Sequence, residues 1–276
     1  MPPCGSQRVT GIPDSDVDTV VSDLQLDNPI QIDKTKAGDG SWTVTATFPP
    51  CESSLTHAEH VAANAPATSV AGAAIQGFDL NRDCGKLIPK ILAAGIKFVA
   101  RYYSHSATKN IGPSEAQALS SAGVDIVSVW ESGGDHPAFF SRAQGIDDAT
   151  SAAKQAQSVG QPAGTPIYFA VDYDASQAEL NSAIVPYFQG VADGLRIMAS
   201  AGPTYGAGVY GSGLVCGTLF GQGLVTHTWL SMSTGFRDSK IYTAWNIKQH
   251  LTADPFGLGV QVDPDEAKGD YGGFRV

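Results

Sequence analysis

The sequence predicts an α/β fold, an irregular (β/α)8 barrel of the TIM type with helices missing between its last strands, preceded by a short N-terminal extension. From residue 75 onward, short runs rich in β-branched and aromatic residues alternate with segments whose apolar residues recur at helical spacing. Such alternation favours parallel strands joined by right-handed crossovers. Eight strand-like runs favour closure into a barrel, with an open doubly wound sheet as the alternative. We therefore divide the chain into an extension, residues 1–74, and a barrel, residues 75–276.

The first half of the barrel region is regular. Its four predicted strands are residues 75–80, 96–103, 124–131 and 165–171. The segments between them predict helices over residues 84–95, 112–123 and 147–160. Pro113 suits a first helical turn. After the fourth strand, Ser176 and Glu179 have the spacing of a capping box, and we expect the helix that they open to break or restart at Pro186.

The second half is less regular. A fifth strand is predicted over 206–212, and three further strands over 226–233, 241–249 and 259–263. The links at 234–240 and 250–258 are short and rich in Gly and Pro, so full helices are not expected there. No glycine fingerprint for a dinucleotide or a nucleotide phosphate follows any of the strands.

The N-terminal extension has a different composition. The alternating run SWTVTATF (41–48) predicts a half-buried strand, and residues 62–74 have the small side chains of a linker. Cys4 and Cys51 bracket the polar segment and could form a disulfide; four cysteines allow three pairings, and free buried thiols are an equal alternative. The opening residues lack the pattern of a secretory signal. A removed signal, retention inside the cell and another export route all fit that observation.

Composition and charge exclude several classes of function. The net charge of −10, without clusters of Lys and Arg, argues against a nucleic-acid or anionic-membrane partner. Hydrophobic residues make up 42% and charged residues 16%, as in a globular protein, and no apolar run reaches membrane-spanning length. The histidines and cysteines show no metal-ligand spacing, and Ser212 lacks the context of a serine-hydrolase nucleophile. We expect neither a metal nor a cofactor.

Polar and aromatic residues gather where the predicted strands end. In a parallel β/α barrel, these ends converge on one face. In chain order the residues are Asp79, Arg101, Tyr103, Trp130, Glu131, Asp172, Asp174, Tyr210, Trp229, Trp245, Gln249, Asp263 and Asp265. Aromatic rings stack on sugars, and glycosidic bonds are cleaved by pairs of carboxyl groups. The sequence therefore predicts a sugar-binding mouth, in which Asp79 and Asp172 lie close enough to raise each other's pKa.

Several of these residues also have a plainer interpretation. A single Asp after a strand is often a turn former or a helix N-cap, and Asp174 suits that role. Glu131 is equally well explained as a solvated side chain, and Arg101 as the partner of a structural carboxylate. Trp229 and Trp245 could fill the core. Only the repetition of carboxylates at successive strand ends favours a pocket.

Segments of the barrel region also resemble a known family, and they are GFDLNRD, AAGIKFVARYYS, LSSAGVDIVSVWESG, AQGIDDATSAAKQAQSVGQPAGTPIYFAVDYD and GVYGSG. Together they resemble the glycoside-hydrolase-like domain of unknown function typified by a mycobacterial secreted protein. That domain is related to the lysozyme-type muramidases of glycoside hydrolase family 25. The resemblance covers about residues 75–276, and it implies an irregular β/α barrel that acts on or binds bacterial cell-wall glycan.

The resemblance also implies site residues. The muramidases carry an acid in a G-x-D motif on the first strand, which Asp79 matches, and a V-D motif on the last strand, which Asp263 matches. Their fourth strand ends in D-x-E, whose Glu is the proton donor. Here Asp172 stands at the Glu position and Ala170 at the position of the preceding Asp. The acid is thus shorter and one carboxylate is missing, so Glu131 is a candidate second carboxyl.

The expected function is a glycoside hydrolase acting on a polysaccharide, with peptidoglycan as the first substrate to test. Asp172 is the expected general acid, Asp79 and Asp263 the nucleophilic or electrostatic partners, and Glu131 a further catalytic carboxyl. The residues expected to bind the glycan are Arg101, Tyr103, Trp130, Asp174, Tyr210, Trp229, Trp245 and Gln249. We expect a monomer located outside the cell or in its envelope. The alternatives are a non-catalytic glycan-binding barrel and a toxin or effector delivered by its N-terminal segment.

Overall fold

The computed structural model describes residues 6–15, 17–25, 30–38, 40–47 and 74–276. The chain divides into two compact units, Met1–Ser69 and Val70–Val276. Cys4 and Cys51, and with them the predicted disulfide, lie outside the described residues. The same holds for the linker predicted over 62–74, except for its last residue, Ala74. Cys84 and Cys216 are buried free thiols.

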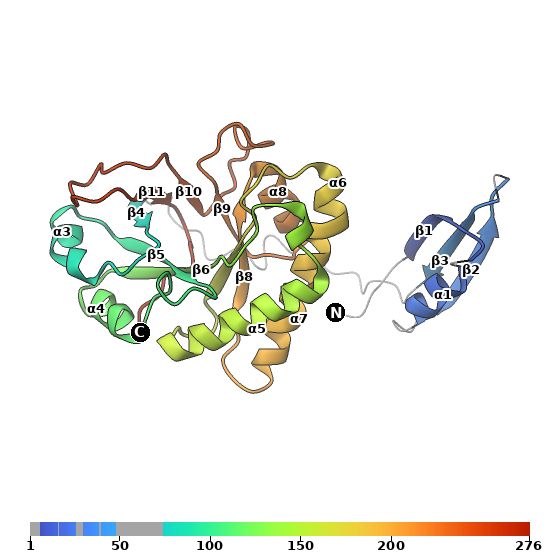
Figure 1. Cartoon of the computed structure of the whole chain (residues 1–276), viewed down its shortest axis with the longest axis horizontal. Helices are drawn as coiled ribbons and strands as arrows, with labels where there is room; N and C mark the ends of the chain where they lie inside the picture. The colour runs from blue at the N-terminus through green and yellow to red at the C-terminus, as the bar shows by residue number, and fades with distance from the viewer. Residues whose placement is uncertain (1–5, 16, 26–29, 39, 48–73) are drawn as a thin grey trace. The chain divides into compact units, whose positions relative to one another are not determined.

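The N-terminal unit contains a small antiparallel sheet and one helix (Figure 1). Its elements are β1 (Ser6–Ile12), α1 (Val17–Gln25), β2 (Gln31–Lys36) and β3 (Trp42–Thr47), with strand order β1-β3-β2. The central strand β3 occupies the segment that was predicted as a strand at 41–48. Val44 and Ala46 of this strand are fully buried and cluster with Val17 of the helix. The alternation of SWTVTATF therefore separates a helix-covered face from a polar one.

The C-terminal unit is a closed eight-stranded barrel, as predicted (Figure 1). Its strands pair in chain order, and the last one closes the barrel between its predecessor and the first. They are β4 (Ile75–Asp79), β5 (Phe98–Tyr103), β6 (Asp125–Trp130), β7 (Pro166–Ala170), β8 (Gly206–Gly211), β9 (His227–Leu230), β10 (Ile247–Gln249) and β11 (Asp263–Ala267).

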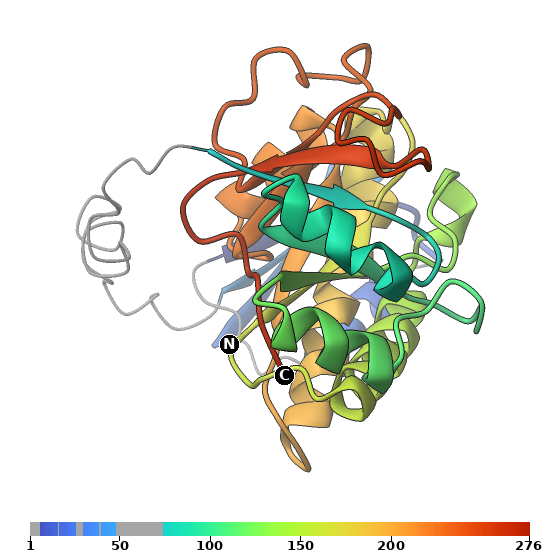
Figure 2. The same ribbon diagram turned by 90° about the vertical axis from the view of Figure 1, so that its left-hand side faces the viewer.

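The last strand differs from the prediction in both position and direction. A parallel strand was predicted over 259–263, whereas β11 begins at Asp263 and runs antiparallel to both β4 and β10 (Figure 2). The reason lies in the link over residues 250–262, which contains no helix to return the chain to the opposite end of the barrel. A strand that starts where its neighbour ends has to run antiparallel to it.

Helices cover the outside of the first five barrel strands. They are α3 (Ile88–Ala93), α4 (Pro113–Ser121), α5 (Arg142–Val159), α6 (Gln177–Glu179), α7 (Val185–Ala199) and α8 (Gly213–Gly221). Two short 3-10 turns, η1 (Gly85–Leu87) and η2 (Pro137–Phe139), accompany them, and a π-helical segment, η3 (Leu180–Ile184), joins α6 to α7. The predicted capping box of Ser176 and Glu179 opens α6, and Pro186 stands in the first turn of α7, where a restart was expected. α5 begins before the predicted residue 147, because Ser141 caps it by accepting a hydrogen bond from the Gln144 N–H.

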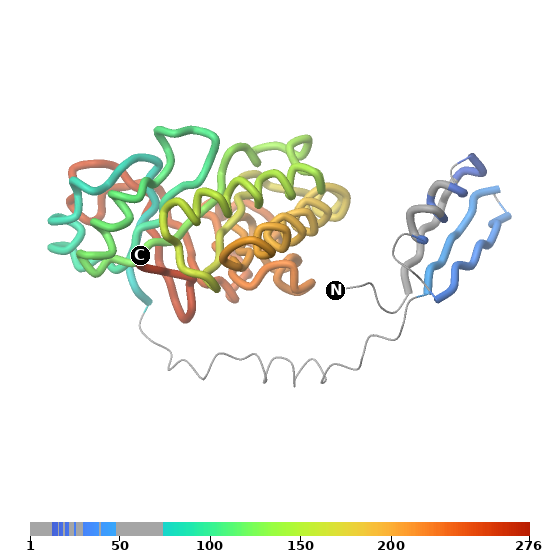
Figure 3. The backbone as a smooth tube through the Cα atoms, turned by 90° about the horizontal axis from the view of Figure 1, so that it is seen from below, coloured from blue at the N-terminus to red at the C-terminus, as the bar shows by residue number. Residues whose placement is uncertain are grey.

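The two longest of these helices, α5 and α7, lie side by side along the barrel (Figure 3). Their backbones approach so closely that a Cβ at Gly145 would lie 2.0 Å from the Tyr187 carbonyl oxygen. A Cβ at Gly190 would lie 2.0 Å from the Arg142 carbonyl oxygen. These two glycines therefore permit the helix packing outside β6 to β8.

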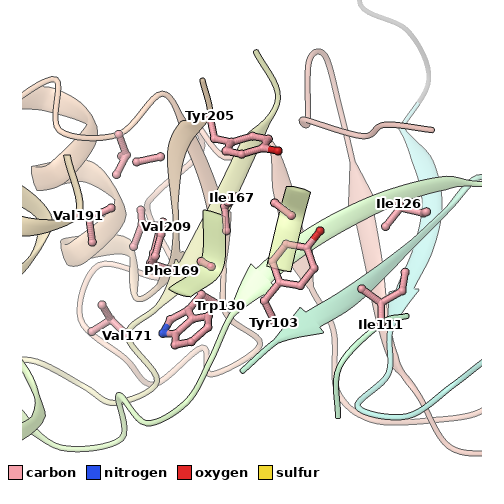
Figure 4. Packing of buried hydrophobic residues seen from close by; sticks show 14 of the residues in the cluster. Tyr103, Ile111, Ile126, Trp130, Ile167, Phe169, Val171, Val191, Tyr205 and Val209 are labelled. Atoms are coloured by element: carbon pink, nitrogen blue, oxygen red, sulfur yellow. The ribbon is translucent and has the colours of Figure 1, made fainter. Parts of the chain in front are cut away.

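Successive strand residues point alternately into the barrel and outward. The inward set, which we call the lumen cluster, is Phe98, Ala100, Tyr102, Val127, Val129, Tyr168, Ala170, Tyr210, Trp229, Ile247 and Ala267. The outward set packs against the helices and includes Tyr103, Trp130, Phe169 and Val209 (Figure 4). The lumen is filled by side chains, since a Cβ at Gly77 would lie 2.4 Å from the Phe98 ring. Open space is therefore expected only beyond the strand ends.

In the part of the chain that the structure describes, no helix has the length and apolar character needed to cross a membrane.

Candidate active site

Four carboxylates lie at one end of the barrel, which we call the mouth. Asp79 ends β4, Glu131 directly follows β6, and Asp172 follows β7 by two positions. All three occupy inward positions in the alternation of their strands. Asp263 joins them from the start of β11, and its backbone pairs with Asp79 because that strand is antiparallel. The reversed direction of the last strand thus still delivers its carboxylate to the mouth.

Asp79 is the most buried of the four mouth carboxylates, with 2% of its surface exposed. Each of its oxygens accepts one hydrogen bond, from the Tyr102 hydroxyl at 2.6 Å and from the Gln249 amide at 2.6 Å. Burial, and then the nearby charge of Asp263, raise the pKa of Asp79 to about 7, against the effect of the two donors. Asp79 is therefore poised to be either protonated or ionised near neutral pH.

Gln249 connects Asp79 to the opposite side of the lumen. Because its amide nitrogen donates to Asp79, its Oε1 is the acceptor for the Tyr210 hydroxyl at 2.8 Å and for the Met232 N–H at 3.4 Å. Tyr210 also lies close enough to Asp172 to lower the pKa of that carboxyl. A chain of hydrogen bonds from Tyr102 through Asp79 and Gln249 to Tyr210 therefore orients the polar groups of β4, β5, β8 and β10.

A cavity of about 550 Å³ opens at the mouth, between the loops that follow β5, β6 and β7. Its lining residues are Ser104, His105, Ser106, Lys109, Glu131, Ser132, Gly133, Asp135 and Asp172. Two of the four mouth carboxylates, Glu131 and Asp172, thus face one cavity. A cavity of this size is sufficient for a sugar unit and its immediate linkages.

The two cavity carboxylates have different surroundings. Burial raises the pKa of Asp172, and the negative charges of Glu131 and Asp135 raise it further, while Lys109 and Tyr210 lower it. Glu131 instead forms an ion pair with the Lys109 ammonium group, which also lies 4.3 Å from the centre of the Tyr102 ring. Asp172 therefore has a raised pKa, whereas Glu131 has a cationic partner.

A glycine-rich loop after β6 brings these two carboxylates together. Gly134 has a φ of 105°, and a Cβ there would lie 2.7 Å from the Ala170 carbonyl oxygen. Its own carbonyl accepts a hydrogen bond from the Asp172 N–H at 2.8 Å. The sequence ESGGD after β6 therefore folds back on the end of β7 because glycine tolerates this backbone and this approach.

Arg101, predicted to bind glycan, is placed elsewhere. It points outward from β5 and has no exposed surface. Its guanidinium forms a two-point ion pair with Glu115 of α4, at 2.7 and 3.1 Å, and donates to the Leu80 carbonyl. With these partners no donor surface remains for a ligand, and the structural interpretation of Arg101 replaces the predicted one.

Tyr103 and Trp130 also point outward, into the layer between strands and helices. The Tyr103 hydroxyl donates to Gln161 at 2.9 Å, and Trp130 packs edge-on against the His105 ring with centroids 5.0 Å apart. Both side chains are almost fully buried. The predicted glycan contacts of these two residues are therefore corrected, because each residue is one position out of phase with the lumen.

Asp174 and Trp245 are also away from the cavity. Asp174 accepts a hydrogen bond from the Arg237 N–H at 2.8 Å and pairs with its guanidinium, so it anchors the loop after β9. Trp245 precedes the first residue of the parallel strand β10 and so lies at the end of the barrel opposite the mouth, where the Lys268 ammonium stands 3.8 Å from its ring centre. Neither position supports a sugar contact.

Trp229 lies within the lumen, below the mouth. Its ring packs edge-on against Tyr168 and Tyr210, and its indole N–H donates to Asp265 at 3.0 Å. Because Trp229 is 1% exposed, it fills the core, which was the plainer interpretation of this residue.

Sequence reasoning missed Tyr102, Lys109 and His105 as mouth residues. Tyr102 could have been predicted, since it lies two and four positions after Ala100 and Phe98 on β5 and so points into the lumen as they do. The predicted residue was its neighbour, Tyr103. Lys109 and His105 lie in the loop after β5, where no periodic pattern fixes a side-chain direction. Among the described residues, no three His, Cys, Asp or Glu side chains are grouped so as to hold a metal ion.

Comparison with protein families agrees with the barrel fold. Residues 89–267, more than half of the chain, match the model of the Rv2525c-like, glycoside hydrolase-like domain. The chain belongs to this family. The family predicted from the sequence segments is thereby confirmed, and the matched range includes Glu131, Asp172 and Asp263.

Two curated relatives of the Rv2525c-like domain come from Bacillus subtilis strain 168. The uncharacterized protein FadG is 35% identical over 187 residues, which are 64% of this chain and 32% of FadG. The uncharacterized protein YbfG is 36% identical over 152 residues, which are 51% of this chain and 21% of YbfG. The chain thus spans a third or less of the length of these relatives.

A solved structure of the same family matches the barrel. It is the Tat-secreted protein Rv2525c of Mycobacterium tuberculosis in complex with L-tartrate, with a TM-score of 0.60 and 25% identity, covering 74% of this chain and 99% of that one. Lysozyme-type structures match at lower scores, among them the modular autolysin LytC of Streptococcus pneumoniae at a TM-score of 0.48 and 13% identity.

Proposed function

We propose that this Rv2525c-like domain hydrolyses glycosidic bonds in a polysaccharide, with bacterial peptidoglycan as the first substrate. Asp172 is the general acid, and Glu131 is the nucleophile or the base that activates water. The observation that carries the proposal is the pairing of these two carboxyls in one cavity with opposite electrostatic surroundings. Glycoside cleavage requires this division between a protonated and an ionised carboxyl.

The reaction follows from that division. Asp172 transfers its proton to the glycosidic oxygen as the bond to the anomeric carbon breaks. Glu131, paired with Lys109, bonds to the anomeric carbon, and a water that gives its proton to Asp172 then hydrolyses the resulting glycosyl ester. Alternatively, Glu131 removes a proton from a water that attacks the anomeric carbon directly. The first route retains the anomeric configuration and the second inverts it, so the configuration of the first product distinguishes them.

Asp79 and Asp263 stabilise the positive charge that develops on the sugar in this mechanism. The transition state carries positive charge on the sugar ring, and nearby carboxylates stabilise it. Asp79 is held by Tyr102 and Gln249, so its orientation is fixed before substrate arrives. Of the aromatic residues predicted to hold the sugar, Tyr210 is the one whose hydroxyl belongs to this hydrogen-bonded network. The His105 ring and the hydroxyls of Ser104, Ser106 and Ser132 are the cavity groups that we assign to glycan binding.

The family assignment supports the reaction class. The muramidase motifs that Asp79 and Asp263 match, together with the acid Asp172 at the position of the muramidase Glu, support peptidoglycan as substrate. The related Rv2525c is a Tat-secreted protein. We accordingly propose an extracellular or cell-envelope location for this domain, where its substrate lies.

Release of reducing ends from purified peptidoglycan tests the proposal. The Asp172→Asn and Glu131→Gln variants are expected to lose about 10²- to 10⁴-fold in rate, the usual contribution of an acid or base. Asp147→Asn makes the same chemical change at an exposed position on α5 and is expected to keep full activity. Equal rates for wild type and Asp172→Asn would remove Asp172 from the mechanism.

Two departures from the muramidase motifs favour a second function, a barrel that binds glycan without cleaving it. Ala170 stands where the muramidases carry a carboxylate, and Asp172 is shorter than their Glu by one methylene, a displacement to which catalysis is sensitive. Binding of peptidoglycan without release of reducing ends, on every glycan tried, would establish this second function in place of the first.

A further inference from the structure

Asp265 is a buried carboxyl that the proposed reaction does not use. It lies on β11, one inward position deeper in the lumen than Asp263, and its backbone pairs with Gly77 of β4 and Gln249 of β10. The residue has no exposed surface. Its Oδ1 accepts the indole N–H of Trp229 at 3.0 Å, whereas its Oδ2 has no hydrogen-bond partner among the described residues.

The ionisable groups that face Asp265 are all acids or phenols. They are Asp263 on its own strand, Asp79 on β4, Tyr168 on β7 and Tyr210 on β8. No cationic side chain of the described residues contributes to its surroundings. Burial, and next the charge of Asp79, therefore hold the pKa of Asp265 well above its usual range.

Asp79 and Asp265 thus compete for a single negative charge, and the hydrogen-bond donors decide between them. Asp79 accepts a donor on each oxygen, from Tyr102 and from Gln249, whereas Asp265 accepts one donor in total. Each donor stabilises the charged form of the carboxyl that accepts it. A neutral Asp265 also avoids an anionic oxygen that is buried without any partner.

We propose that Asp265 carries the proton of a buried Asp79–Asp265 pair and is a positioning residue that keeps the negative charge on Asp79, at the mouth. The proton resides on an Asp265 carboxyl oxygen, and Asp79 is the group that ionises first. The catalytic consequence, a fixed negative charge near the sugar, rests on the proposed function, whereas the assignment of the proton does not.

Unfolding midpoints in urea at pH values from 4 to 9 test the assignment, with wild type, Asp79→Asn and Asp265→Asn. A carboxyl whose pKa is raised in the folded protein destabilises the fold, and this destabilisation grows as the pH rises from about 4 to the folded pKa. Replacement of the carboxyl by Asn removes the destabilisation. The midpoint of Asp265→Asn relative to wild type is expected to keep rising above pH 7. That of Asp79→Asn should stop rising near pH 7. The exchanged pattern would overturn the assignment.

Infrared spectroscopy at pH 8 gives a second readout that does not require Asp79→Asn to fold. The difference spectrum of wild type minus Asp265→Asn is expected to contain the carbonyl band of one protonated carboxyl, since the bands of other protonated carboxyls such as Asp172 cancel. The matched control Glu266→Gln, at the outward neighbour on β11, should give a difference spectrum without this band. Absence of the band from the Asp265→Asn difference spectrum would refute the assignment.

The two proposals fail separately. A wild-type protein that cleaves no glycan refutes the proposed function and leaves the protonation of Asp265 intact. The exchanged pH pattern refutes the role of Asp265 and leaves glycan cleavage intact.

Discussion

Two buried carboxyls, Glu115 outside the barrel wall and Asp79 inside it, have opposite surroundings. Glu115, outside the barrel, is 5% exposed and is neutralised by the Arg101 guanidinium through two contacts. Asp79, inside it, is 2% exposed and accepts only the neutral donors Tyr102 and Gln249. Its charged neighbours are the carboxylates Asp263 and Glu131, which raise its pKa.

The difference separates a structural carboxyl from a functional one. A buried charge with a well-placed counter-ion contributes to specific packing, and its loss is felt as instability. A buried carboxyl beside like charges is held at an energetic cost, and such groups occur mainly where a charge is used in binding or catalysis. The outward face of β5 therefore stabilises the barrel, while the inward face prepares the mouth.

Removal of the counter-ion from Glu115 is the variant with the largest expected effect on stability, and it tests whether Glu115 is a structural carboxyl. Arg101→Met leaves a carboxylate buried without a cation, and we expect the free energy of unfolding to fall by about 3–5 kcal/mol. Urea denaturation at pH 7 measures this loss. The double variant Arg101→Met/Glu115→Leu should recover most of it, because no unpaired charge then remains. A single variant as stable as wild type would show that the pair is not structural.

The sequence was sufficient to predict the barrel, because hydrophobic periodicity over eight segments is a property of local sequence. It failed at β11, where the missing crossover helix reversed the strand. Even so, the V-D motif placed Asp263 beside Asp79, since the start of an antiparallel strand meets the ends of its parallel neighbours.

Side-chain direction was the weaker part of the prediction. Tyr103 and Trp130 were chosen as strand-end residues, although a shift of one residue turns a side chain from the lumen to the helix layer. The neighbouring Tyr102 occupies the lumen position. Lys109 could not be predicted, because its role depends on how the loop after β5 folds against Glu131.

Removal of the Lys109 charge at the mouth is expected to have a smaller effect, and it tests whether the inward carboxyls are functional. Lys109→Met removes the partner of Glu131, and we expect kcat/KM on peptidoglycan to fall about tenfold, or about 1.4 kcal/mol. Lys109 also lowers the pKa of Asp172. Removal of Lys109 raises the pKa of Asp172, so the general acid stays protonated to higher pH. The alkaline limb of the pH–rate profile therefore shifts to higher pH. Lys109→Arg, which keeps the charge, should leave the limb in place, and a limb unmoved in Lys109→Met would contradict the assigned acid.

The adjacent tyrosines of β5, one inward and one outward, allow the comparison with the smallest expected effect on stability. Tyr103→Phe removes one hydrogen bond to Gln161, and Tyr102→Phe removes one to Asp79. Each should cost about 1 kcal/mol at pH 5, where Asp79 is protonated in the folded wild type and the folded variant alike, so that its titration cancels from the comparison.

The two variants should diverge as the pH rises. Loss of the Tyr102 donor raises the folded pKa of Asp79 above about 7. Between pH 7 and that higher pKa, Asp79 is ionised in folded wild type but still protonated in folded Tyr102→Phe, so the variant loses additional stability there. Tyr103→Phe, on the outward face, has no such linkage and should keep the same deficit relative to wild type at pH 8. Urea denaturation at the two pH values measures the divergence, and parallel losses in both variants would mean that Tyr102 does not stabilise the charged form of Asp79.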